Sequence, residues 1–61
     1  MMINSIQVQY IKDGKLTWTD EVSKNGFRKE IVLEDGLTEV RGYYGVYLVW
    51  VQYPNLHSLA T

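Results

Sequence analysis

Hydrophobic and polar residues alternate along the first part of the chain. Over residues 3–11, Ile6, Val8 and Tyr10 fall on one side of an extended backbone, and glutamines fall on the other. A period of two is typical of a half-buried β-strand. The turn-forming triplet Lys12-Asp13-Gly14 follows. The pattern therefore predicts that the chain opens with a β-hairpin.

The length of that turn decides which residues of the second strand share a face with the first. A two-residue loop at Asp13-Gly14 would pair Tyr10 with Thr17. A three-residue loop, with its glycine in the left-handed region, would pair Tyr10 with Leu16 and bring Trp18 to the same apolar face. A slip of one residue scatters that face. We therefore favour the three-residue loop.

Glycine turns divide the next part of the chain into further strands. Asn25-Gly26 is the strongest hairpin signal, and residues 27–33 alternate as a half-buried strand would. Asp35-Gly36 ends that strand. Residues 37–41 then form a short fourth strand, closed by residues 42–45.

The following stretch, residues 46–53, has apolar or aromatic residues on both faces. This predicts a strand that is covered on both sides. Pro54 stops it, and residues 55–61 are either a short closing strand or a tail. No segment sustains a helical period, so we expect essentially no helix. The pattern predicts an all-β fold, a small antiparallel sheet or Greek-key meander of five to six strands in a single domain over residues 1–61.

The length of the chain limits its core. Sixty-one residues allow one domain with a modest interior, which needs reinforcement. The chain has no cysteine, which excludes disulfides and thiolate metal sites, and the single histidine, His57, cannot form a histidine cluster. We expect no metal and no cofactor. Reinforcement would come from a homo-oligomer or a protein partner.

The charges are nearly balanced, with 7 acidic and 6 basic residues. A basic excess of the kind that binds phosphates or a membrane surface is missing, so we expect neither nucleic acid nor membrane as a partner. The first fifteen residues lack the pattern of a signal peptide. The chain is therefore expected to be cytoplasmic, or to be a piece of a larger processed chain.

Residues that could perform catalysis are few and poorly placed. His57 and Ser58 are neighbours and would point to opposite faces of a strand. The acidic pairs Asp20-Glu21 and Glu34-Asp35 lie at predicted strand ends, where a solvated turn is the ordinary explanation. No glycine loop suited to phosphate is present. We therefore expect a protein that is not an enzyme.

Five aromatic residues within eleven positions are the candidate binding residues: Tyr43, Tyr44, Tyr47, Trp50 and Tyr53. Strict alternation would separate Tyr47, Val49, Val51 and Tyr53 from Val46, Leu48 and Trp50. A thin core covers only one of these faces, so the other packs on a second sheet, another subunit or a ligand. Core packing and an interface role both stay open.

Read in order, these segments resemble the middle portion of a jacalin-related lectin domain of the zymogen-granule type. The likeness rests on short motifs: Ile3-x-Ser5-Ile6-Gln7-Val8-Gln9-Tyr10, Trp18, Asn25-Gly26, Glu30-Ile31-Val32-Leu33 and, most specifically, Gly36-x-x-Glu39-Val40-x-Gly42-Tyr43-Tyr44-Gly45. They span residues 3–53. The resemblance implies a β-prism-like fragment and carbohydrate recognition. The family's glycine-rich opening loop and its Gly-x-x-x-Asp loop are both missing here, so only Tyr43 and Tyr44 fall on a loop near the sugar of some relatives.

Three functions follow as hypotheses. The leading one is a lectin-like binding domain that self-associates through its aromatic strand and recognises a carbohydrate or a glycan-bearing partner. The alternative is a small protein-binding module or inhibitor, such as a phage-encoded one, that docks on a larger protein through the same strand. The third, a binder of single-stranded nucleic acid, would need Lys24, Arg28, Lys29 and Arg41 to form a groove.

Overall fold

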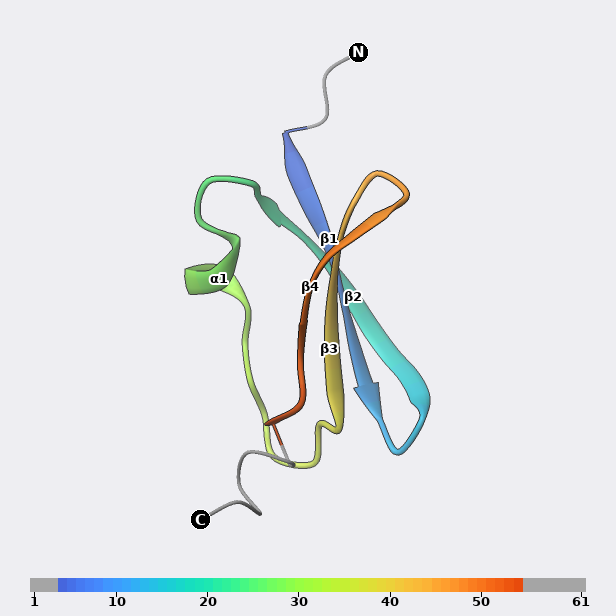
Figure 1. Ribbon diagram of the computed structural model, residues 1–61. Helices are drawn as coiled ribbons and strands as arrows, with labels where there is room; N and C mark the ends of the chain where they lie inside the picture. The colour runs from blue at the N-terminus through green and yellow to red at the C-terminus, as the bar shows by residue number, and fades with distance from the viewer. Residues whose placement is uncertain (1–3, 55–61) are drawn as a thin grey trace.

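The protein is built on one antiparallel sheet, seen in a computed structural model that describes residues 4–54. Its strands are β1 (Ser5–Lys12), β2 (Lys15–Ser23), β3 (Glu39–Tyr44) and β4 (Tyr47–Gln52), in the spatial order β2-β1-β3-β4 (Figure 1). The predicted all-β class is confirmed. The expected five to six strands exceed the four strands found in the described residues.

The β1–β2 hairpin closes through a two-residue turn. Asp13 (φ 51°) and Gly14 (φ 80°) both adopt the left-handed region, and Lys12 pairs with Lys15. Two consecutive residues with positive φ twist the chain in the sense that the flanking strands require. The predicted three-residue loop is therefore wrong.

A β-bulge at Thr17 brings Trp18 onto the same apolar face as Tyr10, which is the result for which the three-residue loop was favoured. The pairing shifts between Tyr10 and the next residue, so Tyr10 lies opposite Trp18, and the Thr17 hydroxyl donates to the Tyr10 carbonyl oxygen at 2.9 Å. The rings of Tyr10 and Trp18 stack with centroids 4.4 Å apart. Leu16 is opposite Ile11 instead, on the other face of the sheet, and is exposed.

The strand predicted after Asn25-Gly26 is not formed. Residues 27–30 make a single helical turn, α1 (Phe27–Glu30), in which the amides of Lys29 and Glu30 donate to the Gly26 carbonyl oxygen. The apolar residues Phe27 and Ile31 are four positions apart, so the turn places both against the core. In a strand, Lys29 would share a face with Phe27 and Ile31, so a charged side chain would lie between the two apolar residues that pack on the core.

Residues 31–38 cross one face of the sheet as an extended segment. The Val32 amide donates to the Tyr10 hydroxyl oxygen at 3.2 Å, and the Thr38 amide donates to the Ile11 carbonyl oxygen at 2.8 Å. The turn expected at Asp35-Gly36 is present, with Gly36 at φ 92°. Leu37 follows it and is fully buried. The segment therefore covers this face of the sheet, and its hydrogen bonds to Tyr10 and Ile11 hold it against β1.

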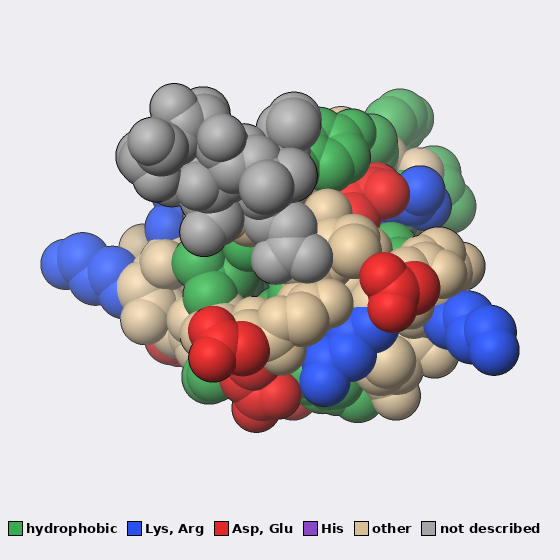
Figure 2. All heavy atoms as spheres, turned by 90° about the horizontal axis from the view of Figure 1, so that it is seen from below, with side chains coloured by type: hydrophobic (Ala, Val, Ile, Leu, Met, Phe, Trp, Pro, Cys, Tyr) green, Lys and Arg blue, Asp and Glu red, His purple; other side chains and the backbone are tan. Residues whose placement is uncertain are grey.

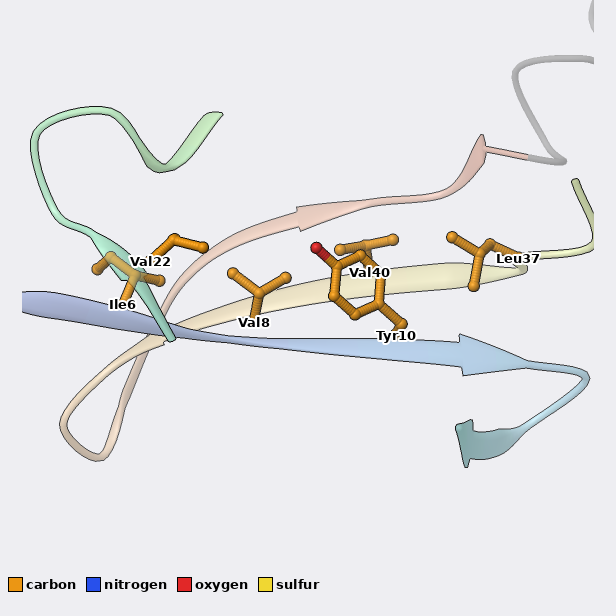
Figure 3. Packing of buried hydrophobic residues seen from close by; sticks show 6 residues of the cluster. All are labelled: Ile6, Val8, Tyr10, Val22, Leu37 and Val40. Atoms are coloured by element: carbon orange, nitrogen blue, oxygen red, sulfur yellow. The ribbon is translucent and has the colours of Figure 1, made fainter. Parts of the chain in front are cut away.

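The core therefore lies between one sheet face, called the inner face here, and the cover made by α1 and residues 31–38. Figure 3 shows six of its side chains on that side of the sheet: Ile6, Val8, Tyr10, Val22, Leu37 and Val40. Trp18, Phe27, Ile31, Tyr44 and Trp50 pack around them. The opposite, outer face carries mostly polar or exposed side chains, and Ile11, which pairs there with Leu16 and Glu39, is buried.

Candidate functional site

The five candidate aromatic residues all lie on or beside the β3–β4 hairpin, but they face different environments. Tyr44 and Trp50 are half-buried and pack on the core. Tyr43 is half-buried on the outer face, where it lies opposite Gln7 of β1. Tyr47 is 71 % exposed and Tyr53 is 47 % exposed. Two of the five therefore serve mainly as core, and the others are available for contact.

The division of β4 into two faces differs from strict alternation because β4 contains an extra residue. Gly42 pairs with Trp50 but Tyr43 pairs with Leu48, which leaves Val49 without a partner position on β3. Leu48 consequently lies on the outer face and Trp50 on the inner face. The expectation that these two residues share a face is wrong, since a β-bulge between them shifts the alternation.

The turn of the hairpin also differs from the prediction. Residues 42–44 belong to β3, and the turn is made by Gly45 (φ 64°) and Val46. Gly42 is buried on the inner face, where a Cβ atom would lie 3.3 Å from Ile6 Cγ2 and 3.7 Å from Phe27 Cε2. Gly42 thus gives the Phe27 ring room over β3, where that ring meets the Trp50 ring edge to face at 6.0 Å.

Three basic residues, Lys24, Arg28 and Lys29, lie in α1 or just before it, and two of them approach aromatic rings. The Lys24 ammonium lies 5.4 Å from the centre of the Tyr44 ring, and the Arg28 guanidinium lies 5.8 Å from the centre of the Phe27 ring. Residues 24–29 line a shallow hollow of about 160 Å³. Arg41 lies elsewhere, on the outer face, where it pairs with the Glu39 carboxylate. The structure does not bring the four basic residues into one groove.

Acidic and basic side chains are interspersed at one end of the molecule. Figure 2 looks onto the end that carries the β1–β2 turn, and acidic and basic side chains alternate around it. On the outer face, a hydrogen bond from the Arg41 guanidinium to Glu39 raises the pKa of Arg41. Neither sign dominates the end of the molecule that Figure 2 shows.

The exposed part of the hairpin is apolar and carries no charge. Val46 is 86 % exposed, and Leu48, Val49 and Val51 add further exposed aliphatic surface beside Tyr47. The sequence contains no Asp, Glu, Lys or Arg after Arg41. We call residues 46–53 the hairpin surface. Exposed apolar residues are common singly, but a contiguous set is typical of an interaction site.

β4 was expected to be covered on both sides, and this expectation is wrong for the described chain. Among residues 4–54, β4 pairs with β3 alone and is therefore an edge strand, in a sheet whose other edge is β2. Its two apolar faces led to the prediction of a central strand, because periodicity reports how much apolar surface a strand carries and not what covers that surface. Leu48 and Val51 were not singled out as binding residues. The run without charges after Arg41 is the signal that could have identified them.

The acidic pairs offer no site for acid–base chemistry. Asp20 pairs opposite Val8 and Glu21 opposite Gln7, so their carboxylates lie on opposite faces of the sheet. Glu34 and Asp35 are exposed in the segment that crosses the inner face. Within residues 4–54 no three His, Cys, Asp or Glu side chains come close enough to hold a metal ion. His57 and Ser58 lie outside the described residues.

Across residues 4–54 no helix has the length and apolar character needed to cross a membrane. Comparison of the chain with protein-family models, with curated proteins and with solved structures found no match. The resemblance to jacalin-related lectins therefore stays a prediction from short motifs, and the hairpin surface is the feature of the structure that points to a function.

Proposed function

We propose that this chain is a non-enzymatic protein-binding module, and that the hairpin surface is its binding element. The observation that carries the proposal is the state of β4: an uncharged edge strand whose apolar side chains are largely exposed. An edge strand presents unpaired backbone amides and carbonyls to a partner strand. The exposed side chains add apolar contact on either side of that backbone.

The contrast between the two sheet edges supports this choice. The edge strand β2 carries Lys15, Asp20 and Glu21, all exposed, and the bulge at Thr17. Charges and bulges are the usual means by which proteins keep an edge from pairing. β4 has a bulge at Val49 but no charge. Charged residues therefore protect the β2 edge against pairing with another strand, and no charged residue protects the β4 edge.

Site-specific photo-crosslinking tests the proposal. Tyr47 and Tyr53 are each replaced by benzoylphenylalanine, an aromatic exchange that keeps the shape of the site, and Thr19 on β2 receives the same group as a control. The chains are irradiated in the cells that produce them. We expect protein adducts from positions 47 and 53 that disappear when Leu48→Lys is added, and none from position 19. Equal labelling from both edges would contradict the proposal.

Carbohydrate recognition is the second candidate, and the exposed rings of Tyr47 and Tyr53 favour it, since sugar rings stack on accessible aromatic faces. A glycan array and titrations with mannose and galactose test it. Binding that is lost in Tyr47→Ala but kept in Tyr47→Phe would support a stacking site. No response to either sugar or to the array would remove this candidate.

A further inference from the structure

The edge strand β4 has a chemistry that suits a second copy of itself. In a two-fold antiparallel pair, residues near the axis face their own copies, so any charge there meets a like charge. A β2 pair whose axis lies beside Asp20 and Glu21 would set these residues against the same acidic residues of the other chain. β4 contains no charged residue, so no like charges would meet in such a pair.

The register of the sheet allows such a pair. Trp50 and Gln52 are opposite Gly42 and Val40, so both lie on the inner face, while Val51 is opposite Arg41 on the outer face. A two-fold axis beside Val51 sets Val51 against its own copy and Trp50 against Gln52. Residues that oppose each other then share a face, as the pleat requires. The bulge at Val49 lies outside this central stretch.

The small core explains why pairing with a second copy would stabilise the chain. Seven hydrophobic side chains are buried in the described residues, and the chain has no cysteine for a disulfide. Chains of this size usually need reinforcement from a metal, a disulfide or another subunit. The sheet extended through β4 would also place Tyr43, Leu48 and Val51 of both copies at its centre, as one outer apolar band.

We propose that the chain forms a two-fold dimer in which the β4 strands of two copies pair antiparallel around Val51, giving one continuous eight-stranded sheet. This rests on the proposed function, since it names the partner of the hairpin surface. Assembly stops at two copies, because each copy contributes its one β4 strand and the charged β2 strands form the two outer edges of the extended sheet.

Sedimentation of the purified full chain tests the stoichiometry. We expect a dimer at micromolar concentration, a monomer for Val51→Lys, and an unchanged dimer for Thr19→Lys, which places the same charge on the β2 edge. Val51→Thr, which keeps a β-branched side chain without a charge, should retain the dimer. A wild-type chain that stays monomeric up to the highest soluble concentration would overturn the proposal.

Cysteine cross-linking tests the geometry, and the absence of native cysteine makes each result unambiguous. Opposed residues of an antiparallel pair have Cα atoms about 4.5–5.5 Å apart, within the range that a disulfide spans. Oxidised Val51→Cys should therefore form a covalent dimer, and Thr19→Cys should not. A dimer that cross-links through position 19, or not at position 51, would show a different interface and overturn the proposal.

The two proposals can fail separately. A monomer in sedimentation, together with adducts to a different protein from positions 47 and 53, would refute self-pairing and leave the protein-binding function standing. A monomer without such adducts would refute both. Adducts with the mass of two copies of the chain would support both.

Discussion

Tyr10 shows how much of this fold depends on one side chain. Its ring is fully buried and stacks on Trp18, while its hydroxyl oxygen accepts the Val32 amide and so fastens the 31–38 segment to the sheet. Burial raises the pKa of Tyr10, and the nearby Asp20 carboxylate acts in the same direction. A residue that alternation alone would describe as apolar core is also the polar link between two layers.

Substitution of Tyr10 by Phe should make stability less dependent on alkaline pH. Because the folded-state pKa is raised, the contribution of the neutral hydroxyl is fully present below about pH 10, the pKa of an unfolded tyrosine, and is lost as pH rises through the folded pKa. Tyr10→Phe should cost about 1 kcal/mol at neutral pH, since the Val32 amide loses its partner. The difference from wild type should shrink above about pH 10.

Urea unfolding followed by tryptophan fluorescence between neutral pH and about pH 11 measures this difference. Tyr47→Phe is the matched control, because it removes the same hydroxyl group from a ring that is exposed on the hairpin surface. If the gap between Tyr10→Phe and wild type stayed constant over the whole range, the hydroxyl would have no pH-dependent role.

At the scale of elements, each hairpin combines a tight turn with a β-bulge, and the two features together set which residues of its strands pair. β1–β2 combines a two-residue turn with a bulge at Thr17, and β3–β4 combines the turn at Gly45 with a bulge at Val49. In each case the bulge decides which side chains reach the core. Tyr10 meets Trp18 because of the first bulge, and Leu48 is separated from Trp50 by the second.

The β3–β4 hairpin should be sensitive to its turn residue and insensitive to the residue beside it. Gly45→Ala forces a side chain into the left-handed region and should lower the free energy of unfolding by about 1 kcal/mol. Val46→Ala removes only exposed surface and should change that free energy by less than about 0.5 kcal/mol. Urea denaturation of both variants makes the comparison. Equal effects would show that backbone strain at Gly45 is not limiting.

At the scale of the molecule, α1 and residues 31–38 pack on one face of the sheet, and the edge strand β2 is charged while the edge strand β4 of the described sheet is not. The chain folds a small interior against α1 and residues 31–38 (Figure 1). Six of the nine large hydrophobic residues that are exposed in the described chain belong to the hairpin surface. Association through that surface would add to the stability of the fold as well as supply a binding function.

Thermal unfolding should therefore depend on concentration. If the β4 strands pair, raising the protein concentration over a roughly hundredfold range should raise Tm by mass action. Val51→Lys should have a lower Tm that does not change with concentration, and Thr19→Lys should behave as wild type. Scanning calorimetry measures all three. A wild-type Tm that is independent of concentration would show that folding and association are not linked.

Local patterning predicted much of the fold from particular residues. The alternation of Ile6, Val8 and Tyr10 placed β1 and its buried face, and Asp13-Gly14 and Asp35-Gly36 marked turns that the structure contains. The strand at Phe27–Leu33 was mispredicted, because Phe27 and Ile31 reach the core from a helical turn. The candidate binding residues all fall on or beside the β3–β4 hairpin, but the predicted division of β4 into two faces was wrong.

Composition and period by themselves determined that this chain is all-β, that its turns lie at glycines and that its last third is uncharged and aromatic. Those are properties of neighbouring residues, and neighbouring residues suffice to specify them. Only the tertiary structure decided the order β2-β1-β3-β4, the two bulges and the edge position of β4. These depend on which distant strands pair, and pairing is settled by competition among all strands for one thin core.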